Sequence, residues 1–217
     1  MAAVATKIKK IGIIGSGHIG GNLGLLLGKA GYEVFYSSRH PEKLKGLATA
    51  TGTKARAGSV PEAIEFADVV ILSVPLKAIP ELDENTKNAL KGKIVIDTSN
   101  PYPERDGEIA SQALKEPGGM GVFVSKLLPG ARIVRAFNTV YFEDLKKRVN
   151  SNGEKIGIPI AGDDEEGVNA AVELVQHAGL DPVVVGGLNK SKAFDVGTTV
   201  YATSASAQEI RQKLNLK

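Results

Sequence analysis

Three glycines at fixed spacing, within the segment Gly15 to Gly20, have the clearest chemical meaning in this sequence. An apolar run precedes the segment, and a run suited to a helix follows it. In such a strand-to-helix turn, Gly15 permits a tight bend, Gly17 lets the backbone approach an anion, and Gly20 lets helix and strand pack closely. The amide groups at the start of the helix then face the anion, and the helix dipole favours it. The pattern predicts a diphosphate-binding loop for a dinucleotide, the alternative being a glycine-rich turn without ligand.

The polar segment after the second apolar run, residues 37–43, indicates which dinucleotide is bound. Enzymes specific for NAD usually place Asp or Glu there to hold the ribose 2′-hydroxyl, and the end of this run has neither. Ser38 can instead donate to a 2′-phosphate, Arg39 can clamp it, and Lys43 adds a positive charge. An ordinary basic loop is the alternative. We predict NADP(H), with contacts from Ser37, Ser38, Arg39 and Lys43.

Three further apolar runs end in small polar residues or proline, at residues 73–75, 98–101 and 137–140. Ligands of an open parallel sheet bind beyond the carboxyl ends of its strands. The three ends together predict a pocket with an apolar floor and a few amide and hydroxyl groups, suited to a nicotinamide ring and a flat partner. Each end taken alone could be a plain strand-to-loop junction. The predicted lining residues are Ser73, Val74, Pro75, Ser99, Asn100, Asn138 and Thr139.

The elements that must position these residues follow from alternating β-branched apolar runs and helix-length segments, which is typical of βαβ units. Strands are expected at 8–14, 33–36, 68–74, 93–97, 132–137, 158–161 and 182–185. Helices are expected at 19–30, 41–50, 61–66, 78–90, twice within 108–128, at 165–178 and at 208–214. The pattern predicts an α/β fold with a Rossmann-type, doubly wound, mainly parallel sheet. We expect one domain over 1–217, with a nucleotide-binding core at 8–140 and a smaller C-terminal extension or lobe at 141–217.

Composition excludes several other classes of protein. The chain has 217 residues, 42% hydrophobic and 24% charged, and no cysteine, which rules out disulfides, thiolate catalysis and a Cys-built zinc site. A net charge of +3 gives no support for nucleic-acid binding. The absence of a signal sequence and of a long apolar run predicts a cytoplasmic protein without a membrane segment. The scattered histidines predict no metal site, and the acidic residues 163–166 are interpreted as a helix start.

Several strings recur, in order with the glycine segment, in a known family: SSRHPEK, ILSVP, IVIDTSNP, RAFNT and PIAGDD. The chain resembles the NADP-dependent reductases of coenzyme F420, an 8-hydroxy-5-deazaflavin. It also resembles the related cytosolic reductase domain of six-transmembrane metalloreductases, which pass hydride to flavin. The resemblance covers roughly residues 8 to 190.

This resemblance implies a role for each matching position. Ser16, His18 and Ile19 look like the pyrophosphate loop, and Ser38, Arg39 and Lys43 like the 2′-phosphate site. Ser73, Val74 and Pro75 look like a wall along the cofactor, and Asn138 with Thr139 like the nicotinamide pocket. The implied reaction is hydride transfer between NADPH and a small-molecule acceptor, either deazaflavin (coenzyme F420) or a flavin (FMN or FAD). No catalytic side chain is expected, and a homodimer is left open.

Two other functions remain as alternatives. Imine and β-hydroxyacid reductases share such a first domain but normally add a large helical domain, and about thirty residues follow the last expected strand here. A non-catalytic NADP(H)-binding module that senses the cofactor ratio is the second alternative. Turnover with an added acceptor distinguishes it from an enzyme.

Overall fold

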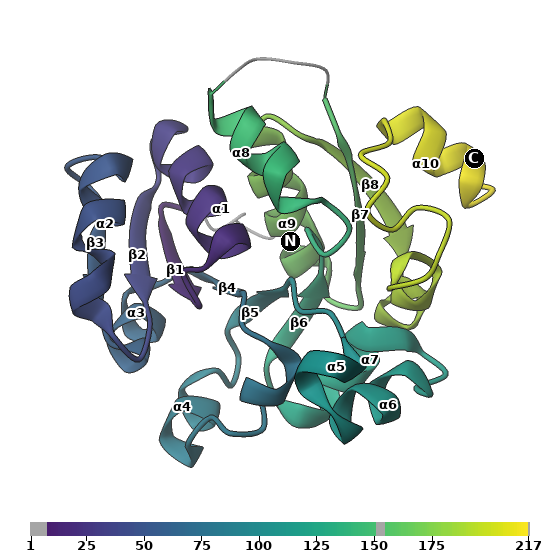
Figure 1. The fold of residues 1–217 in the computed structure, drawn as a ribbon, viewed down its shortest axis with the longest axis horizontal. Coiled ribbons are helices and arrows are strands. Elements are labelled where there is room, and N and C mark those ends of the chain that lie inside the picture. The colour runs from purple at the N-terminus through teal and green to yellow at the C-terminus, as the bar shows by residue number, and fades with distance from the viewer. Residues whose placement is uncertain (1–7, 151–154, 217) are drawn as a thin grey trace, which may run out of the picture.

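The computed structural model describes residues 8–150 and 155–216, which form one eight-stranded sheet with helices on both faces (Figure 1). The strand order is β3-β2-β1-β4-β5-β6-β7-β8. All neighbouring strands are parallel except β6 and β7. The predicted Rossmann-type, mainly parallel α/β fold is therefore confirmed. The strands are β1 (Lys10–Ile14), β2 (Glu33–Ser37), β3 (Arg56–Gly58), β4 (Val69–Leu72), β5 (Ile94–Asp97), β6 (Arg132–Arg135), β7 (Gly157–Gly162) and β8 (Asp181–Gly186).

The helices alternate with these strands, as the βαβ pattern requires. The α-helices are α1 (His18–Lys29), α2 (Lys45–Thr51), α3 (Val60–Phe66), α4 (Glu84–Ala89), α5 (Pro103–Asp106), α6 (Glu108–Leu114), α7 (Gly119–Leu127), α8 (Phe142–Asn150), α9 (Glu165–His177) and α10 (Ala207–Lys213). Three 3₁₀ helices are η1 (Pro41–Leu44), η2 (Leu76–Ala78) and η3 (Leu188–Phe194).

Two apolar cores lie on the two faces of the sheet, because helices cover both faces in a doubly wound fold. Residues of α1, α8 and α9 pack on one face, and residues of α3, α6 and α7 pack on the other. A third, smaller core joins α10 to β7 and β8 near the C-terminus (Figure 1). The C-terminal extension thus continues the sheet and adds a small core of its own.

The predicted helix at 78–90 is wrong over its first half, because α4 begins only at Glu84. Pro80 does not explain the late start, because a proline in the first turn of a helix removes no intrahelical hydrogen bond. The Asp83 carboxylate instead starts the helix by accepting a hydrogen bond from the Thr86 amide at 2.9 Å. The sequence reading also missed β3, α8 and η3.

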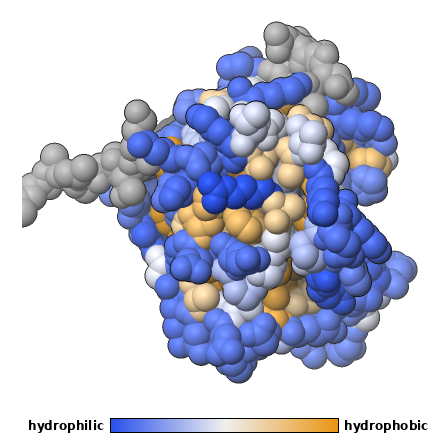
Figure 2. Space-filling view, turned by 90° about the vertical axis from the view of Figure 1, so that its left-hand side faces the viewer, coloured by the Kyte–Doolittle hydropathy of each residue, from blue (hydrophilic) through white to orange (hydrophobic). Residues whose placement is uncertain are grey.

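The β3 edge of the sheet is kept short and charged. β3 has three residues, and its Arg56 guanidinium lies 5.4 Å from the centre of the Phe66 ring, which also packs on Phe35. Figure 2, which looks from the side of Figure 1 where α2 and β3 lie, shows mostly hydrophilic surface around a smaller apolar area. Short, charged edge strands of this kind discourage pairing with other chains.

Candidate functional site

Two of the three glycines in the loop between β1 and α1 are required by contacts within the protein, and the third is not. Gly15 has φ +91°, and a Cβ there would lie 2.4 Å from the Ser73 carbonyl oxygen. A Cβ at Gly20 would lie 2.2 Å from the Gly15 carbonyl oxygen. A Cβ at Gly17 would meet no atom within 4 Å. Gly15 and Gly20 are therefore needed for the close backbone packing of the loop, whereas the space beside Gly17 is open to a ligand.

The first turn of α1 is free to bind an anion. Gly17 is its N-cap, so no side chain caps the helix, and the first turn has no acidic residue. The amide groups there point out of the helix with the positive end of its dipole. His18 is exposed, and its ring lies 4.7 Å from that of Phe142, between centroids. The loop offers backbone donors and leaves them uncapped.

The end of β2 supports the loop with one serine and presents polar groups with the next residues. The buried Ser37 hydroxyl donates to the Ile13 carbonyl at 2.8 Å, and its own carbonyl accepts from the Gly15 amide and the Ser16 hydroxyl, both at 3.2 Å. Ser37 thus braces the loop from within the sheet. The partly exposed Ser38 hydroxyl accepts a hydrogen bond from the His40 amide at 3.0 Å.

Two cations beside the loop lack a counter-charge. Arg39 and Lys43 are exposed, and within residues 8–150 and 155–216 neither forms an ion pair. Glu42, the carboxylate between them in sequence, instead lies 3.5 Å from His40. Unpaired cations next to uncapped amides attract a phosphate.

A cleft of about 530 Å³ opens along the carboxyl ends of the strands, at the β1–β4 switch point of the sheet. Its size is typical of small-molecule sites. The structure brings ten of the predicted site residues together in its lining: Gly17, His18, Ile19, Ser73, Val74, Pro75, Ser99, Asn100, Asn138 and Thr139. The other predicted residues lie outside this lining, in the loop and at the end of β2: Gly15, Ser16, Gly20, Ser37, Ser38, Arg39 and Lys43.

A buried ionic network lies beneath the cleft, and no local sequence pattern predicted it. The fully buried Arg135 guanidinium donates to the Asp97 carboxylate at 2.6 Å, to the Asn100 side chain at 3.1 Å and to Asp195 at 3.3 Å. Burial raises the pKa of Asp97, and the Arg135 charge opposes this rise. The Asp97 carboxylate also accepts from the Ser99 hydroxyl at 2.6 Å. The network thereby holds Ser99 and Asn100 in place.

The turn after β6 is held in an unusual conformation. Phe137 is fully buried and has φ +61°, a left-handed conformation that is uncommon for a non-glycine residue. The following Asn138 donates to the Phe194 carbonyl at 3.0 Å, and its backbone carbonyl accepts from the Asn100 amide group at 2.9 Å. In the described part of the chain, the buried Asn138 Oδ1 has no hydrogen-bond partner. The acceptor atom is itself buried, although Asn138 is among the residues that line the cleft.

Several aromatic and charged residues of the cleft were not predicted. Tyr102 and Arg105 follow β5, Tyr141 and Phe142 lie at the start of α8, and Tyr201 comes from the C-terminal segment. Tyr102 stands two residues beyond the Asn100 already predicted, so its place in the chain was a usable signal. Tyr201 had no such signal, because it lies 99 residues from Tyr102 in sequence and only the folded chain brings the two together.

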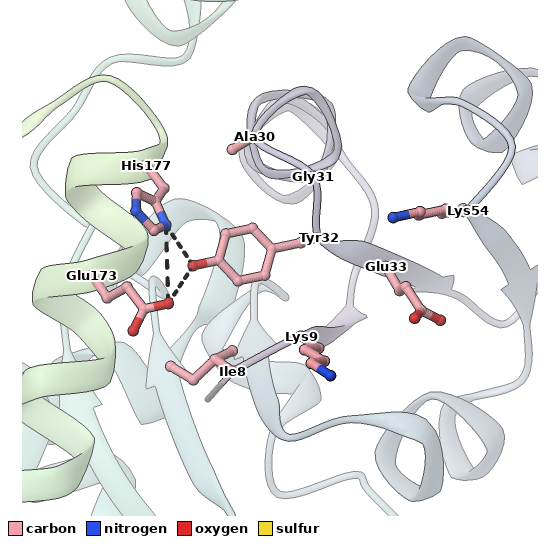
Figure 3. Close-up of a pocket in the computed structure, with 9 residues that line it drawn as sticks. All are labelled: Ile8, Lys9, Ala30, Gly31, Tyr32, Glu33, Lys54, Glu173 and His177. Carbon is pink, nitrogen blue, oxygen red and sulfur yellow. Dashed lines mark hydrogen bonds and ion pairs between the residues drawn. The ribbon is translucent and has the colours of Figure 1, made fainter. Parts of the chain in front are cut away.

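A second pocket, of about 440 Å³, lies at the opposite end of the strands from the cleft, beside the amino ends of β1 and β2 (Figure 3). The Tyr32 hydroxyl lies 2.6 Å from both the Glu173 carboxylate and His177 Nδ1. Burial raises the pKa of Tyr32, and the Glu173 carboxylate adds to the rise. The phenol therefore keeps its proton and donates it to Glu173, so His177 Nδ1–H donates to the phenol oxygen. The three side chains join α9 to β2.

Removal of this hydroxyl by Tyr32→Phe is expected to lower the free energy of unfolding by about 1 kcal/mol. Glu173 and His177 are each partly exposed, so water can replace the lost partner and the cost stays small. Urea unfolding followed by circular dichroism measures the change. A fall in the free energy of unfolding of more than about 3 kcal/mol would contradict this expectation, because it would mean that water does not replace the lost hydroxyl.

The described residues lack the features of two other kinds of site. There, no helix is long and apolar enough to cross a membrane. Across the same residues, no group of three or more His, Asp or Glu side chains is arranged to hold a metal ion. Of the acidic run 163–166, Asp164 caps α9 by accepting from the Gly167 amide at 2.7 Å, which confirms its interpretation as a helix start.

Comparison with known proteins agrees with the resemblance seen in the sequence. The chain is 30% identical over 142 residues to the F420-dependent NADP reductase of Methanocaldococcus jannaschii, covering 63% of this chain and 61% of that protein. It is 25% identical over 192 residues to the metalloreductase STEAP3 of Rattus norvegicus, covering 88% of this chain and 37% of that protein. The chain thus spans less than two thirds of the length of either relative.

The fold has a counterpart among solved structures. A candidate F420-dependent NADP reductase from Arthrobacter sp. FB24 superposes with a TM-score of 0.70 and 19% identity, covering 85% of this chain and 87% of that one. At this identity the likeness concerns the fold alone. The family described as "NADP oxidoreductase coenzyme F420-dependent" matches residues 10–101, the segment that holds the glycine loop, the end of β2 and the ends of β4 and β5. Over residues 10–101 the chain is therefore similar to the coenzyme F420-dependent NADP oxidoreductase family.

Proposed function

We propose that this protein is an oxidoreductase that binds NADP(H) and transfers hydride between NADPH and a deazaflavin or flavin acceptor. One observation carries the proposal: the uncapped first turn of α1 lies next to a strand end with two unpaired cations, Arg39 and Lys43. This arrangement fits a diphosphate and a ribose 2′-phosphate together. The family match over residues 10–101 and the reductases among its relatives support the same activity.

The chain's own residues provide binding and orientation. Amides of the α1 first turn bind the diphosphate, and Ser38, Arg39 and Lys43 bind the 2′-phosphate. The Ser73–Pro75 segment forms a wall of the cleft, and Asn138 and Thr139 line the part assigned to the nicotinamide. When bound, NADPH supplies the hydride, and the protein positions the two rings. The apolar lining of the cleft limits access of water.

The choice of NADPH over NADH is tested with Arg39→Ala. Loss of one charge-assisted hydrogen bond corresponds to about 1.5–3 kcal/mol, so NADPH affinity should fall by about 10- to 150-fold. NADH affinity should change little, because NADH lacks the 2′-phosphate. Nicotinamide fluorescence titration measures both dissociation constants. Arg211→Ala, in α10 and remote from the loop, is the matched control and should change neither.

Turnover decides between an enzyme and a cofactor-sensing module. NADPH oxidation is followed at 340 nm with coenzyme F420, FMN and FAD in turn, and at least one acceptor should accelerate it. Tight NADPH binding without turnover of any acceptor would favour the sensing module instead.

A further inference from the structure

Two tyrosines from distant parts of the chain meet at the cleft. Tyr102 follows β5, and Tyr201 lies in the segment between η3 and α10. Both residues line the cleft together with the ends of β4, β5 and β6, and their hydroxyl groups are hydrogen-bonded to each other. Both side chains are partly buried. The pair therefore faces the same space that the proposed function assigns to the two rings.

One of the two hydroxyl protons of this pair has no acceptor among the described residues. Each phenol carries one O–H, and the hydrogen bond between the two oxygens uses only one of the two protons. Across residues 8–150 and 155–216, neither hydroxyl has a further partner. One O–H of the pair is thus left to donate to water or to a ligand in the cleft. Partly buried donors usually have such a partner.

The surroundings of the pair favour a protonated phenol, which suits an acceptor that becomes negative. The Arg105 guanidinium lies 4.8 Å from the centre of the Tyr102 ring, and it pairs with Asp106 at 2.7 Å. Burial raises the pKa of Tyr201, so the phenol keeps its proton at neutral pH. A protonated phenol close to a cation stabilises negative charge that develops on a neighbouring ring.

We propose that the Tyr102–Tyr201 pair donates its spare O–H to a carbonyl oxygen or ring nitrogen of the hydride acceptor. This proposal rests on the proposed function and narrows the acceptor to conjugated ring systems that carry such an atom. Hydride, with its electron pair, bonds to the electrophilic ring atom, and a pair of ring electrons moves onto the conjugated oxygen or nitrogen. The phenol proton bonds to that atom, NADPH becomes NADP⁺, and the phenolate regains a proton from water.

The test compares Tyr102→Phe, Tyr201→Phe and the double variant with wild type. A further control is Tyr32→Phe, because Tyr32 lies at the opposite end of the strands from the cleft. Each single variant keeps one phenol O–H but loses the hydrogen bond that orients it, so its NADPH oxidation rate with FMN or coenzyme F420 should fall by only about 2- to 12-fold. The double variant lacks both protons, and its rate should fall by about 100-fold. Tyr32→Phe should match wild type.

Binding gives a second readout that does not depend on turnover. Titration of FMN or coenzyme F420 fluorescence should show acceptor affinity about 2- to 12-fold weaker in the double variant only, as expected for one neutral hydrogen bond. NADPH affinity should be unchanged in all variants. The solvent deuterium isotope effect on turnover should also be altered in the double variant, because the transferred proton then comes from water.

The outcomes separate the competing explanations. If the pair were only structural, either single change would break its hydrogen bond, so both single variants would show the full loss and the double variant would add nothing. That result, or a double variant with wild-type rate and acceptor affinity, would overturn the proposal while leaving the proposed function intact. Failure of wild type to reduce any acceptor would overturn both.

Discussion

Replacement of Gly17 by valine is expected to weaken NADPH binding by at least about 100-fold while leaving the fold intact. The space beside Gly17 is empty of protein atoms, and its φ of −78° is open to any residue. A valine side chain would occupy the place where a diphosphate must approach the amides of α1. Loss of two charge-assisted hydrogen bonds, at about 1.5–3 kcal/mol each, gives a reduction of this size or more.

Calorimetric titration with NADPH measures the affinity of this variant, and thermal unfolding without ligand measures its stability. Gly46→Val is a suitable control, because a Cβ at Gly46 also meets no atom within 4 Å and the residue lies in α2, away from the cleft. A contrasting variant is Gly20→Ala, whose Cβ would collide with the Gly15 carbonyl and lower stability. Unchanged NADPH affinity in Gly17→Val would contradict the assignment of the loop.

Replacement of Arg135 by methionine is expected to lower the free energy of unfolding by about 3–5 kcal/mol. Methionine fills similar space but leaves the carboxylates of Asp97 and Asp195 buried without their cation. For a chain of this length such a loss lowers the melting temperature by roughly 6–20 °C. Arg132→Met, on the same strand, is the control. Arg132 is partly exposed and pairs with Asp164 at 2.5 Å and Glu166 at 2.7 Å, so its replacement should cost less, about 1–2 kcal/mol.

The pH dependence of Arg135→Met has a defined sign. Without the guanidinium, the pKa of the buried Asp97 rises further above its unfolded value of about 3.9. The folded variant then binds more protons than the unfolded chain, so its stability falls as pH rises through that window. The deficit relative to wild type should therefore shrink toward pH 4. A deficit that grows on acidification would mean that Asp97 is not the group left uncompensated.

Local sequence was sufficient for the elements with strong periodic or capping signals. The strand at residues 10–14, the glycine turn and the helix from His18 could be predicted because their backbone demands appear in neighbouring residues. Short or interrupted elements were harder. β3 has only three residues, so it does not stand out from a loop. In α8 and at Asp83 a local signal was present and overlooked: Phe142, Leu145 and Val149 recur at helical spacing, and Asp83 is a typical N-cap residue.

The glycine loop and the polar segment at the end of β2 were determined by the sequence itself, because glycine and charge requirements act within a few residues. Only the tertiary structure decided that Arg135 lies buried between Asp97 and Asp195, or that Tyr201 meets Tyr102. Such contacts join segments 38 to 99 residues apart. They depend on which strands become neighbours in the sheet, and that arrangement is settled by packing of the whole chain rather than by any one segment.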